Sequence, residues 1–334
     1  TNRQLYDSLL QRYKEIGVAG DVRSNNISII DRAEVPMWRF KPNLTLNLAI
    51  GLLLGGMLGV LAAFLLEFLD DTIKTPDDVE QKLKLAVLGI IPKLGPKENI
   101  ASVAGDPRSS FSEAYRSVRT ALQFATDHGV PRTLLVTSPG SGEGKSTTAM
   151  ALARNFAHLG KRVLLIEADL RNPSLHRSLG LKGQGVGLSN LLAGGCTLAE
   201  ATLDTEEPGL KVVLAGPLPP NPAELLSGSK LVSMLTVAAE RYDQVILDGP
   251  PVLGLADAPI LANAADGTLL VVNSAKTKIN AAQAALKRLL AARARIVGAL
   301  LSKYDAKTAG YGYGYGYHYE SYYAYGSKPR LTKS

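Results

Sequence analysis

Residues 133 to 147 read TLLVTSPGSGEGKST, an apolar run followed by a turn with three glycines and then by Lys145 and Ser146. A strand, a turn and a helix N-terminus in this order direct backbone N–H groups at a phosphate. We expect Lys145 to reach the outer phosphates of ATP and the Ser146 hydroxyl to ligate Mg²⁺. The usual loop has glycine where this chain has Pro139, so the strict pattern fails by one residue. The predicted nucleotide-binding residues are Gly140, Ser141, Gly142, Glu143, Gly144, Lys145, Ser146 and Thr147.

Short apolar runs follow this stretch and alternate with helical patterns. They begin near residues 162, 210, 244, 267 and 295, and they lack the polar alternation of a sheet with one solvated face. Such runs are typical of parallel strands that are covered on both faces. We therefore predict an α/β fold over residues 101–305, with a P-loop NTPase-like, mainly parallel sheet and helices on both faces.

The region before this domain contains turn and cap signals. Thr75 and Pro76 indicate the start of a short helix that ends near residue 83. Residues 88 to 106 are rich in proline and glycine, and we predict that they form a linker.

One long segment of the 334-residue chain carries no charge. Residues 44 to 66 read LTLNLAIGLLLGGMLGVLAAFLL, and 23 residues at ~1.5 Å each are enough to span the ~30 Å hydrocarbon layer. A buried core helix is the alternative, but such a helix is normally shorter and has a polar face. We predict a transmembrane helix over residues 44–68, followed by a juxtamembrane helix and linker over residues 69–100.

The need for cytoplasmic ATP orients the chain in the membrane. We expect residues after 68 in the cytoplasm and residues 1–43 in the periplasm, as the end of an external region that begins before Thr1. The single cysteine, Cys196, fits a reducing compartment. The net charge of +7 comes without a basic stripe that carries interleaved aromatic residues, so we expect no nucleic-acid partner.

The C-terminal segment carries eight tyrosines within fifteen residues. Alternating glycines and the lack of branched aliphatic side chains in this stretch predict a disordered, flexible tail over residues 306–334. A low-complexity adhesive segment, or a strand with tyrosine on one face, is the alternative. An ATP site in the same chain favours phosphate acceptors. The predicted acceptors are Tyr311, Tyr313, Tyr315, Tyr317, Tyr319, Tyr322, Tyr323 and Tyr325.

Two acidic strand ends supply carboxylates that the loop lacks. Asp248 follows QVIL at the carboxyl end of a predicted parallel strand, where it can hold Mg²⁺ through water or simply form a turn. Glu167 and Asp169 end another strand, and their spacing directs both side chains to the same side. We expect one of these two to accept a tyrosine proton. The predicted catalytic residues are Lys145, Glu167, Asp169 and Asp248, and the predicted Mg²⁺ ligands are Ser146, Asp169 and Asp248.

Together these motifs resemble the bacterial tyrosine kinases that are fused to polysaccharide co-polymerase membrane regions in capsule and exopolysaccharide export. The resemblance covers essentially the whole chain and includes QVILDGPPVLGLADA at residues 244 to 258 and FLDDTIKTPDDVEQKL at residues 68 to 83. It implies a Walker A motif with Gly142, Gly144, Lys145, Ser146 and Thr147, a Walker A′ motif with Glu167 and Asp169, and a Walker B motif with Asp248. The family usually has aspartate in place of Glu167, so we favour Asp169 as the base and Mg²⁺ ligand.

Glu113, Arg116 and Arg119 lie three residues apart and share one face of a predicted helix. The spacing alone fits a solvated, salt-bridged face. The same residues match the E-x-x-R-x-x-R element of the family, which implies subunit contacts in a ring, by resemblance an octamer. The resemblance also implies an inner-membrane autokinase that uses ATP and Mg²⁺, phosphorylates its tail between subunits and regulates polysaccharide polymerisation and export. The implied partners are a low-molecular-weight tyrosine phosphatase and polysaccharide export or polymerase proteins.

Two other functions fit parts of the pattern. A deviant P-loop positioning ATPase would hydrolyse ATP without modifying tyrosine, but that group carries a signature lysine where this chain has Gly140. A non-catalytic membrane scaffold would use nucleotide only to drive its assembly. The eukaryotic-type kinase signatures H-R-D and D-F-G are absent from the sequence, so kinase activity here has to come from the P-loop.

Overall fold

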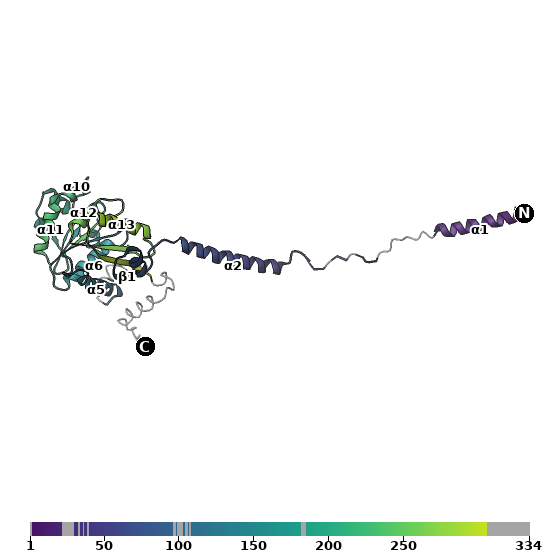
Figure 1. Cartoon of the computed structure of the whole chain (residues 1–334), viewed down its shortest axis with the longest axis horizontal. Coiled ribbons are helices and arrows are strands. Elements are labelled where there is room, and N and C mark those ends of the chain that lie inside the picture. The colour runs from purple at the N-terminus through teal and green to yellow at the C-terminus, as the bar shows by residue number, and fades with distance from the viewer. Residues whose placement is uncertain are drawn as a thin grey trace, which may run out of the picture. The chain divides into compact units, whose positions relative to one another are not determined.

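The structure is a computed structural model, and it forms two compact units, Thr1–Leu69 and Asp70–Ser334, which are described separately below (Figure 1). The residues that it describes are 2–21, 30–32, 34–35, 37–38, 40–95, 98, 103, 106, 108–181 and 185–305. The predicted tail, residues 306–334 with its eight tyrosines from Tyr311 to Tyr325, lies outside the described residues.

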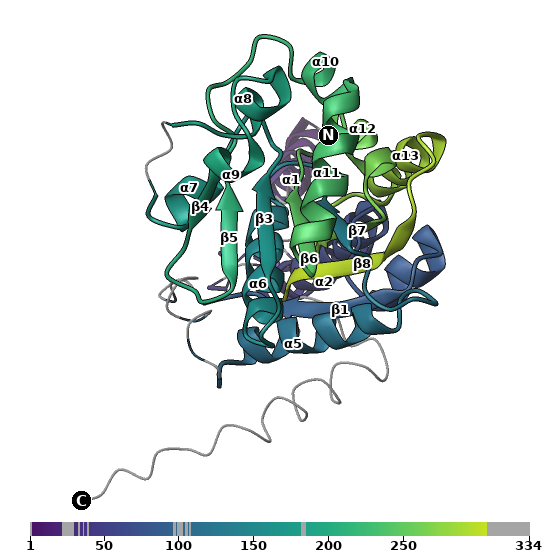
Figure 2. The same cartoon turned by 90° about the vertical axis from the view of Figure 1, so that its left-hand side faces the viewer.

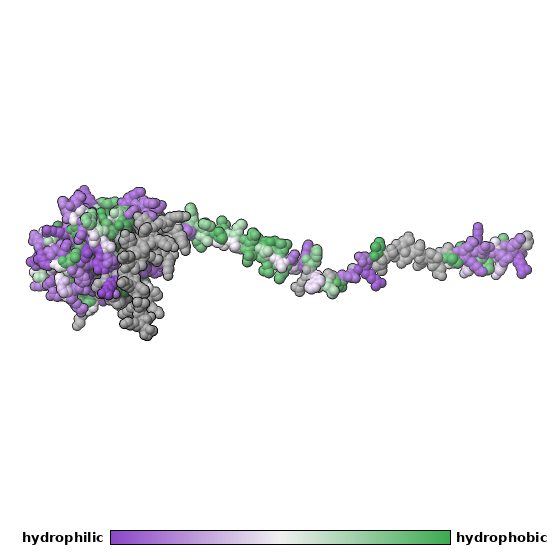
Figure 3. Space-filling model, turned by 90° about the horizontal axis from the view of Figure 1, so that it is seen from below, coloured by the Kyte–Doolittle hydropathy of each residue, from purple (hydrophilic) through white to green (hydrophobic). Residues whose placement is uncertain are grey.

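The first unit contains two helices, α1 (Asn2–Asp21) and α2 (Leu44–Leu69). Among the described residues, α2 is the one helix long and apolar enough to cross a membrane, by its length and composition. Its 26 residues extend about 39 Å at 1.5 Å per residue. None of them is buried, and the side of α2 seen in Figure 3 is largely hydrophobic. The predicted span over residues 44–68 therefore coincides with α2.

The second unit is built on an eight-stranded sheet with the strand order β1-β8-β7-β2-β6-β3-β5-β4. Neighbouring strands run parallel except for β4, which is antiparallel to β5. Every residue of β2, β3, β6 and β7 is buried, as expected for strands covered on both faces. The strands are β1 (Val87–Pro92), β2 (Thr133–Thr137), β3 (Val163–Glu167), β4 (Thr202–Asp204), β5 (Leu210–Val213), β6 (Gln244–Asp248), β7 (Gly267–Asn273) and β8 (Ile296–Tyr304).

Helices cover both faces of this sheet (Figure 2). The apolar side chains of α5 and α6 pack on one face, and those of η1, α8, α11, α12 and α13 pack on the other. The predicted α/β fold is therefore confirmed. The helices are α3 (Pro76–Asp78), η1 (Val79–Leu83), α5 (Ser110–Gln123), α6 (Lys145–Ala157), α7 (Leu175–Ser178), α8 (Leu188–Ala193), α9 (Leu198–Ala201), α10 (Pro222–Ser227), α11 (Ser229–Arg241), α12 (Asp257–Ala264) and α13 (Ile279–Ala291).

The short helix after α2 begins where its cap predicts. The Thr75 hydroxyl accepts a hydrogen bond from the Asp78 amide (3.2 Å), and the Asp78 carboxylate accepts one from the Thr75 amide (2.9 Å). This reciprocal capping box satisfies two amides that the first helical turn leaves free. The helix then continues as the π-helical turn η1.

The prediction of a linker is wrong for residues 87–92, which form the edge strand β1. This strand pairs in parallel with β8 and packs against α5, and the compact unit begins at Asp70. Gly89 is needed for this packing because a Cβ at that position would collide with a methyl group of the fully buried Val118. Gly89 therefore permits a close approach between strand and helix.

We expect Gly89→Ala to lower the free energy of unfolding by about 1–3 kcal/mol, because the added methyl group overpacks the contact with Val118. Urea unfolding of the full chain in detergent measures the change. Gly185→Ala is the matched control, since a Cβ at Gly185 meets no atom within 4 Å. Equal stability of the two variants would show that β1 does not pack on α5.

Candidate functional site

The loop between β2 and α6 has the backbone conformation of an anion-binding turn. Gly142 (φ +75°) and Gly144 (φ +99°) adopt left-handed conformations that glycine takes without strain. Lys145 is the first residue of α6, so the free amides of that helix open toward the loop. The strand, turn and helix therefore occur in the predicted order, and successive amides can converge on a phosphate group.

The loop lysine is paired with a carboxylate that follows β3, two strands away from β2 in the sheet. The Lys145 ammonium lies 2.9 Å from Oδ2 of Asp169, and both side chains are almost completely buried. The other oxygen of Asp169 accepts hydrogen bonds from the amides of Arg171 (3.3 Å) and Asn172 (3.0 Å). A triphosphate in the loop would compete with Asp169 for the charge of Lys145.

Asp248, at the end of β6, is a buried carboxylate that lacks a hydrogen-bond partner among the described residues. Burial raises its pKa to about 7, and the charges of Asp169 and Glu167 add to the shift, while Lys145 and the nearby Ser146 hydroxyl oppose it. An unpaired buried carboxylate is costly, and a cation or its bound water would relieve that cost. Because Ser146 and Asp248 are hard oxygen donors, the site fits the requirements of Mg²⁺.

The Glu167 carboxylate accepts hydrogen bonds from three backbone amides. Its Oε1 accepts hydrogen bonds from the amides of Ser174 and Leu175 (both 2.6 Å), and its Oε2 accepts one from the amide of Ala215 (3.2 Å). The carboxylate thus joins the end of β3 to α7 and to the end of β5. The Ser174 hydroxyl in turn lies 3.2 Å from that of Ser146. This arrangement favours a structural role for Glu167 over a role as base, and leaves Asp169 as the favoured candidate.

Arg171, which follows the acidic pair, forms a two-pronged ion pair with Asp257. The two contacts measure 2.7 and 3.1 Å, and Asp257 is fully buried at the start of α12. Hydrogen bonding to this carboxylate raises the pKa of Arg171. The pair fixes the segment after β3 against the segment after β6.

Residues that follow β7 or lie near the end of β8 bind the phosphate loop at buried positions. The Thr277 hydroxyl donates to Oε1 of Glu143 (2.7 Å), and Oε2 of Glu143 accepts the Gly140 amide (3.1 Å). Burial raises the pKa of Glu143, and these hydrogen bonds oppose the shift. The Ser302 hydroxyl donates to the carbonyl of Glu143 (2.6 Å). Sequence reasoning missed Thr277 and Ser302, although both follow or end parallel strands at the edge where functional groups gather.

The segment that follows α2 pairs with the loop that carries Thr277. The Ile73 amide donates to the carbonyl of Thr277 (2.9 Å), and the Ala275 amide donates to the carbonyl of Ile73 (2.8 Å). Thr277 also donates a hydrogen bond to Glu143 of the phosphate loop. The segment after α2 is therefore connected to that loop through Thr277.

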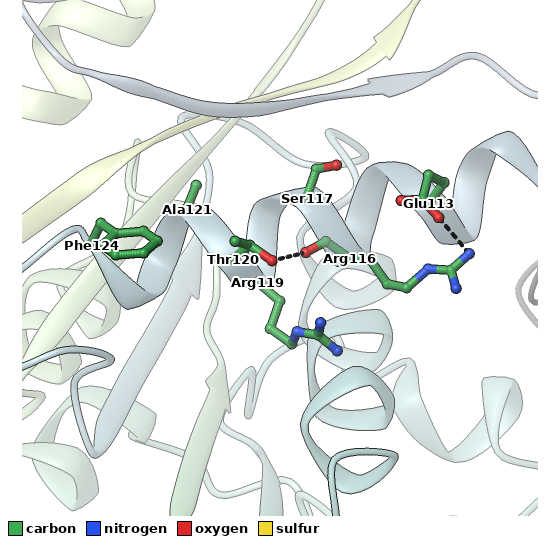
Figure 4. Close-up of a pocket in the computed structure, with 7 residues that line it drawn as sticks. All are labelled: Glu113, Arg116, Ser117, Arg119, Thr120, Ala121 and Phe124. Carbon is green, nitrogen blue, oxygen red and sulfur yellow. Dashed lines mark hydrogen bonds and ion pairs between the residues drawn. The ribbon is translucent and has the colours of Figure 1, made fainter. Parts of the chain in front are cut away.

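The predicted interface residues lie together on α5 and line a shallow pocket with Phe124 (Figure 4). Glu113 and Arg116 form an ion pair of 2.6 Å, and Arg119 donates to the carbonyl of Asn155 on α6 (3.4 Å). Phe124 at the end of α5 is 82% exposed. The shared helix face is confirmed, and its role in subunit contacts stays a prediction.

Comparison with known proteins extends these observations. Residues 132–296 match the family described as "AAA domain", and residues 1–68 match the one described as "G-rich domain on putative tyrosine kinase". Tyrosine-protein kinase YwqD of Bacillus subtilis is 43% identical over 197 residues, which cover 59% of this chain and 83% of YwqD. Tyrosine-protein kinase ptk of Acinetobacter johnsonii is 35% identical over 320 residues, which cover 92% of this chain and 44% of that protein. The kinase domain of the Escherichia coli tyrosine kinase ETK matches with a TM-score of 0.65 and 29% identity, over 73% of this chain and 100% of the ETK domain.

The sheet, the loop and the buried acids define a P-loop nucleotide-binding protein. Within that class, the chain belongs to the bacterial tyrosine-protein kinase family. The predicted resemblance is confirmed, and membership of this family favours a kinase over a positioning ATPase. The chain spans most of the length of YwqD but less than half of that of the Acinetobacter relative.

We expect Asp248→Asn to stabilise the nucleotide-free chain. Because the pKa of Asp248 is raised to about 7, the folded chain holds a proton that the unfolded chain loses near pH 4. The wild type therefore loses stability between about pH 4 and about pH 7, by on the order of a few kcal/mol, and the loss is complete above that range. The advantage of the variant should grow with pH in the same window. Urea unfolding of the full chain in detergent, without Mg²⁺, measures it, and a pH-independent difference would contradict this account.

We expect Glu167→Gln to lower the free energy of unfolding by about 1–3 kcal/mol, because a Gln amide group would face a backbone N–H that now donates to the carboxylate. Glu206→Gln is the control, since Glu206 is exposed. Chemical denaturation compares the two variants. A Glu167→Gln chain as stable as the wild type would mean that the amides around Glu167 contribute little.

Proposed function

We propose that this chain is an ATP-dependent protein-tyrosine autokinase whose acceptors are the tail tyrosines between Tyr311 and Tyr325. The observation that carries the proposal is the buried, unpaired carboxylate of Asp248 beside Lys145 and Ser146. A buried carboxylate beside a lysine and a hydroxyl group at a phosphate loop suits Mg²⁺ and a nucleotide, and the same chain carries eight candidate phenols. Membership of the tyrosine-protein kinase family supports the same assignment.

The proposed reaction is an in-line phosphoryl transfer. A tail phenol attacks the γ-phosphorus of ATP, the bond from phosphorus to the bridging oxygen breaks, and ADP leaves with the electron pair. The backbone amides of residues 140–147 and the Lys145 ammonium hold the phosphates, and Lys145 leaves Asp169 to do so. Asp169 then accepts the phenolic proton, although a loose transition state needs little help from a base.

Magnesium completes the proposed site. Ser146, Asp169 and Asp248 would hold Mg²⁺, which supplies positive charge to the phosphate oxygens. Glu167 keeps the segment around Ser174 in place, and Ser174 lies next to the Ser146 hydroxyl. The residue therefore acts on the site through its neighbours.

We further propose that the transfer occurs between subunits of a ring, with Glu113, Arg116 and Arg119 at the contacts. The tail is long enough for this, because the residues from Tyr304 to Tyr325 reach at most ~70 Å when extended and typically ~25 Å as a coil. An octamer is the proposed ring size, by resemblance to the family.

The proposed cellular setting is the inner membrane of a bacterium. Helix α2 would anchor the chain, with residues 1–43 in the periplasm and the kinase domain and tail in the cytoplasm. We propose that phosphorylation regulates capsule or exopolysaccharide polymerisation and export, with a low-molecular-weight tyrosine phosphatase and polysaccharide export or polymerase proteins as partners.

We expect Lys145→Ala to reduce the rate of phosphotyrosine formation at least about 100-fold, because the loop loses the charge that faces the outer phosphates. The full chain in detergent, incubated with labelled Mg-ATP, is analysed by peptide mapping of the tail. Lys287→Ala is the control, because Lys287 is exposed on α13. Release of inorganic phosphate by the wild type, with the tail unmodified, would support an ATPase instead.

A further inference from the structure

The last residues of β8 bind two carbonyls of the phosphate loop. The Lys303 ammonium donates to the carbonyl of Gly142 (2.8 Å), and the Ser302 hydroxyl donates to the carbonyl of Glu143 (2.6 Å). Lys303 is exposed and is separated from Gly142 by 161 residues. Two successive carbonyls of the loop therefore bond to two successive residues of one strand end.

These contacts fix the direction of the loop amides. In a trans peptide the C=O and the next N–H point in opposite directions. Because Lys303 binds the Gly142 carbonyl, the Glu143 amide points the opposite way, toward the phosphate-binding side of the loop. Because Ser302 binds the Glu143 carbonyl, the Gly144 amide likewise points away from Ser302 and toward that side. The positive charge of the Lys303 ammonium also polarises the Gly142–Glu143 peptide, which makes the Glu143 N–H a stronger hydrogen-bond donor.

The backbone at Lys303 is shaped for this contact. Its φ of +53° is left-handed, which is unfavourable for a residue with a side chain. Such a conformation persists where neighbours determine it, and it is common at functional sites. On one side Ser302 is bonded to Glu143, and on the other the carbonyl of Tyr304 accepts the Lys93 amide (2.8 Å).

A second ammonium group lies close to the same face of the loop. The Nζ atom of Lys276 is 3.9 Å from the position that a Cβ on Gly142 would take. The positive charges of Lys276 and Lys303 both favour the ionised form of Glu143. The outer face of the loop thus carries two cations and one buried carboxylate, a net positive charge that suits a polyanionic ligand.

We propose that Lys303 is a positioning residue for nucleoside diphosphates and triphosphates: it holds the Gly142–Glu143 peptide so that the Glu143 amide is directed at the phosphates before the ligand arrives. This inference rests on the proposed nucleotide site. Preorganised donors bind a charged ligand more tightly because no reorientation is needed on binding. Lys303 does not touch the ligand; it acts through the loop.

The left-handed conformation allows a sharp test. Lys303→Gly removes the ammonium group but also relieves the backbone strain, so the melting temperature should stay the same or rise while nucleotide affinity falls. Lys303→Met removes the charge at similar length, and Lys303→Arg keeps a donor. Arg293→Gly is the matched control, because Arg293 is also left-handed (φ +62°) and exposed but belongs to the turn after α13. Relief of strain alone should raise its melting temperature and leave affinity unchanged.

Calorimetric titration of the dephosphorylated full chain in detergent with Mg-ADP measures the affinity. We expect Lys303→Gly and Lys303→Met to weaken Mg-ADP binding about 5- to 20-fold, and Lys303→Arg to remain within about threefold of the wild type. Wild-type affinity in the Gly and Met variants would overturn the proposal, and so would a loss of affinity that is matched by a fall in the melting temperature of Lys303→Gly. A wild-type chain that binds Mg-ADP but forms no phosphotyrosine would overturn the kinase assignment alone, and one that fails to bind Mg-ADP would overturn both.

Discussion

In a phosphate loop, each backbone N–H that points at the ligand belongs to a planar trans peptide. The carbonyl of the same peptide therefore points away from the ligand, toward the protein. The rest of the site depends on how those carbonyls are satisfied, since a buried polar group without a partner lowers stability. Here the Ser302 hydroxyl satisfies the buried carbonyl of Glu143, Lys303 binds the exposed carbonyl of Gly142, and the side chain of Glu143 connects the loop to Thr277. The end of β8 and the β7–α13 loop are therefore structural parts of the nucleotide site.

Three carboxylates lie near one another at this site, and each is accommodated differently. Asp169 forms an ion pair with Lys145, and Glu167 accepts hydrogen bonds from three backbone amides. Asp248 has no hydrogen-bond partner among the described residues. Burial of Asp248 raises its pKa and favours its protonated form. If Asp248 holds the cation that we propose, its unpaired carboxylate would favour activity at the expense of stability, a conflict that is common in active sites.

The predictable parts of this structure are those specified by short, local patterns. The loop before Lys145, the apolar strands and the cap at Thr75 each occupy a few consecutive residues, and Asp248 follows from the rule that functional groups gather at the carboxyl ends of parallel strands. Strand β1 could not be predicted in this way, because Gly89 is explained only by Val118 on another element. Partners of Glu167 lie up to 48 residues away, and Lys303 lies 161 residues from its partner in the loop. Contacts over such separations leave no local signal.

Strand β8 ends at Tyr304, one residue after the contact that holds the phosphate loop, and the first tail tyrosine follows seven residues later at Tyr311. In the proposed reaction the acceptors are covalently joined to the strand that holds the loop, and a short tether keeps its end at an effective concentration of about a millimolar. In the assembly that we propose, an acceptor attached in this way would meet a loop in a unimolecular step, so diluting the protein would not slow the encounter while the assembly persists. A tyrosine peptide free in solution would have to exceed that local concentration in order to compete.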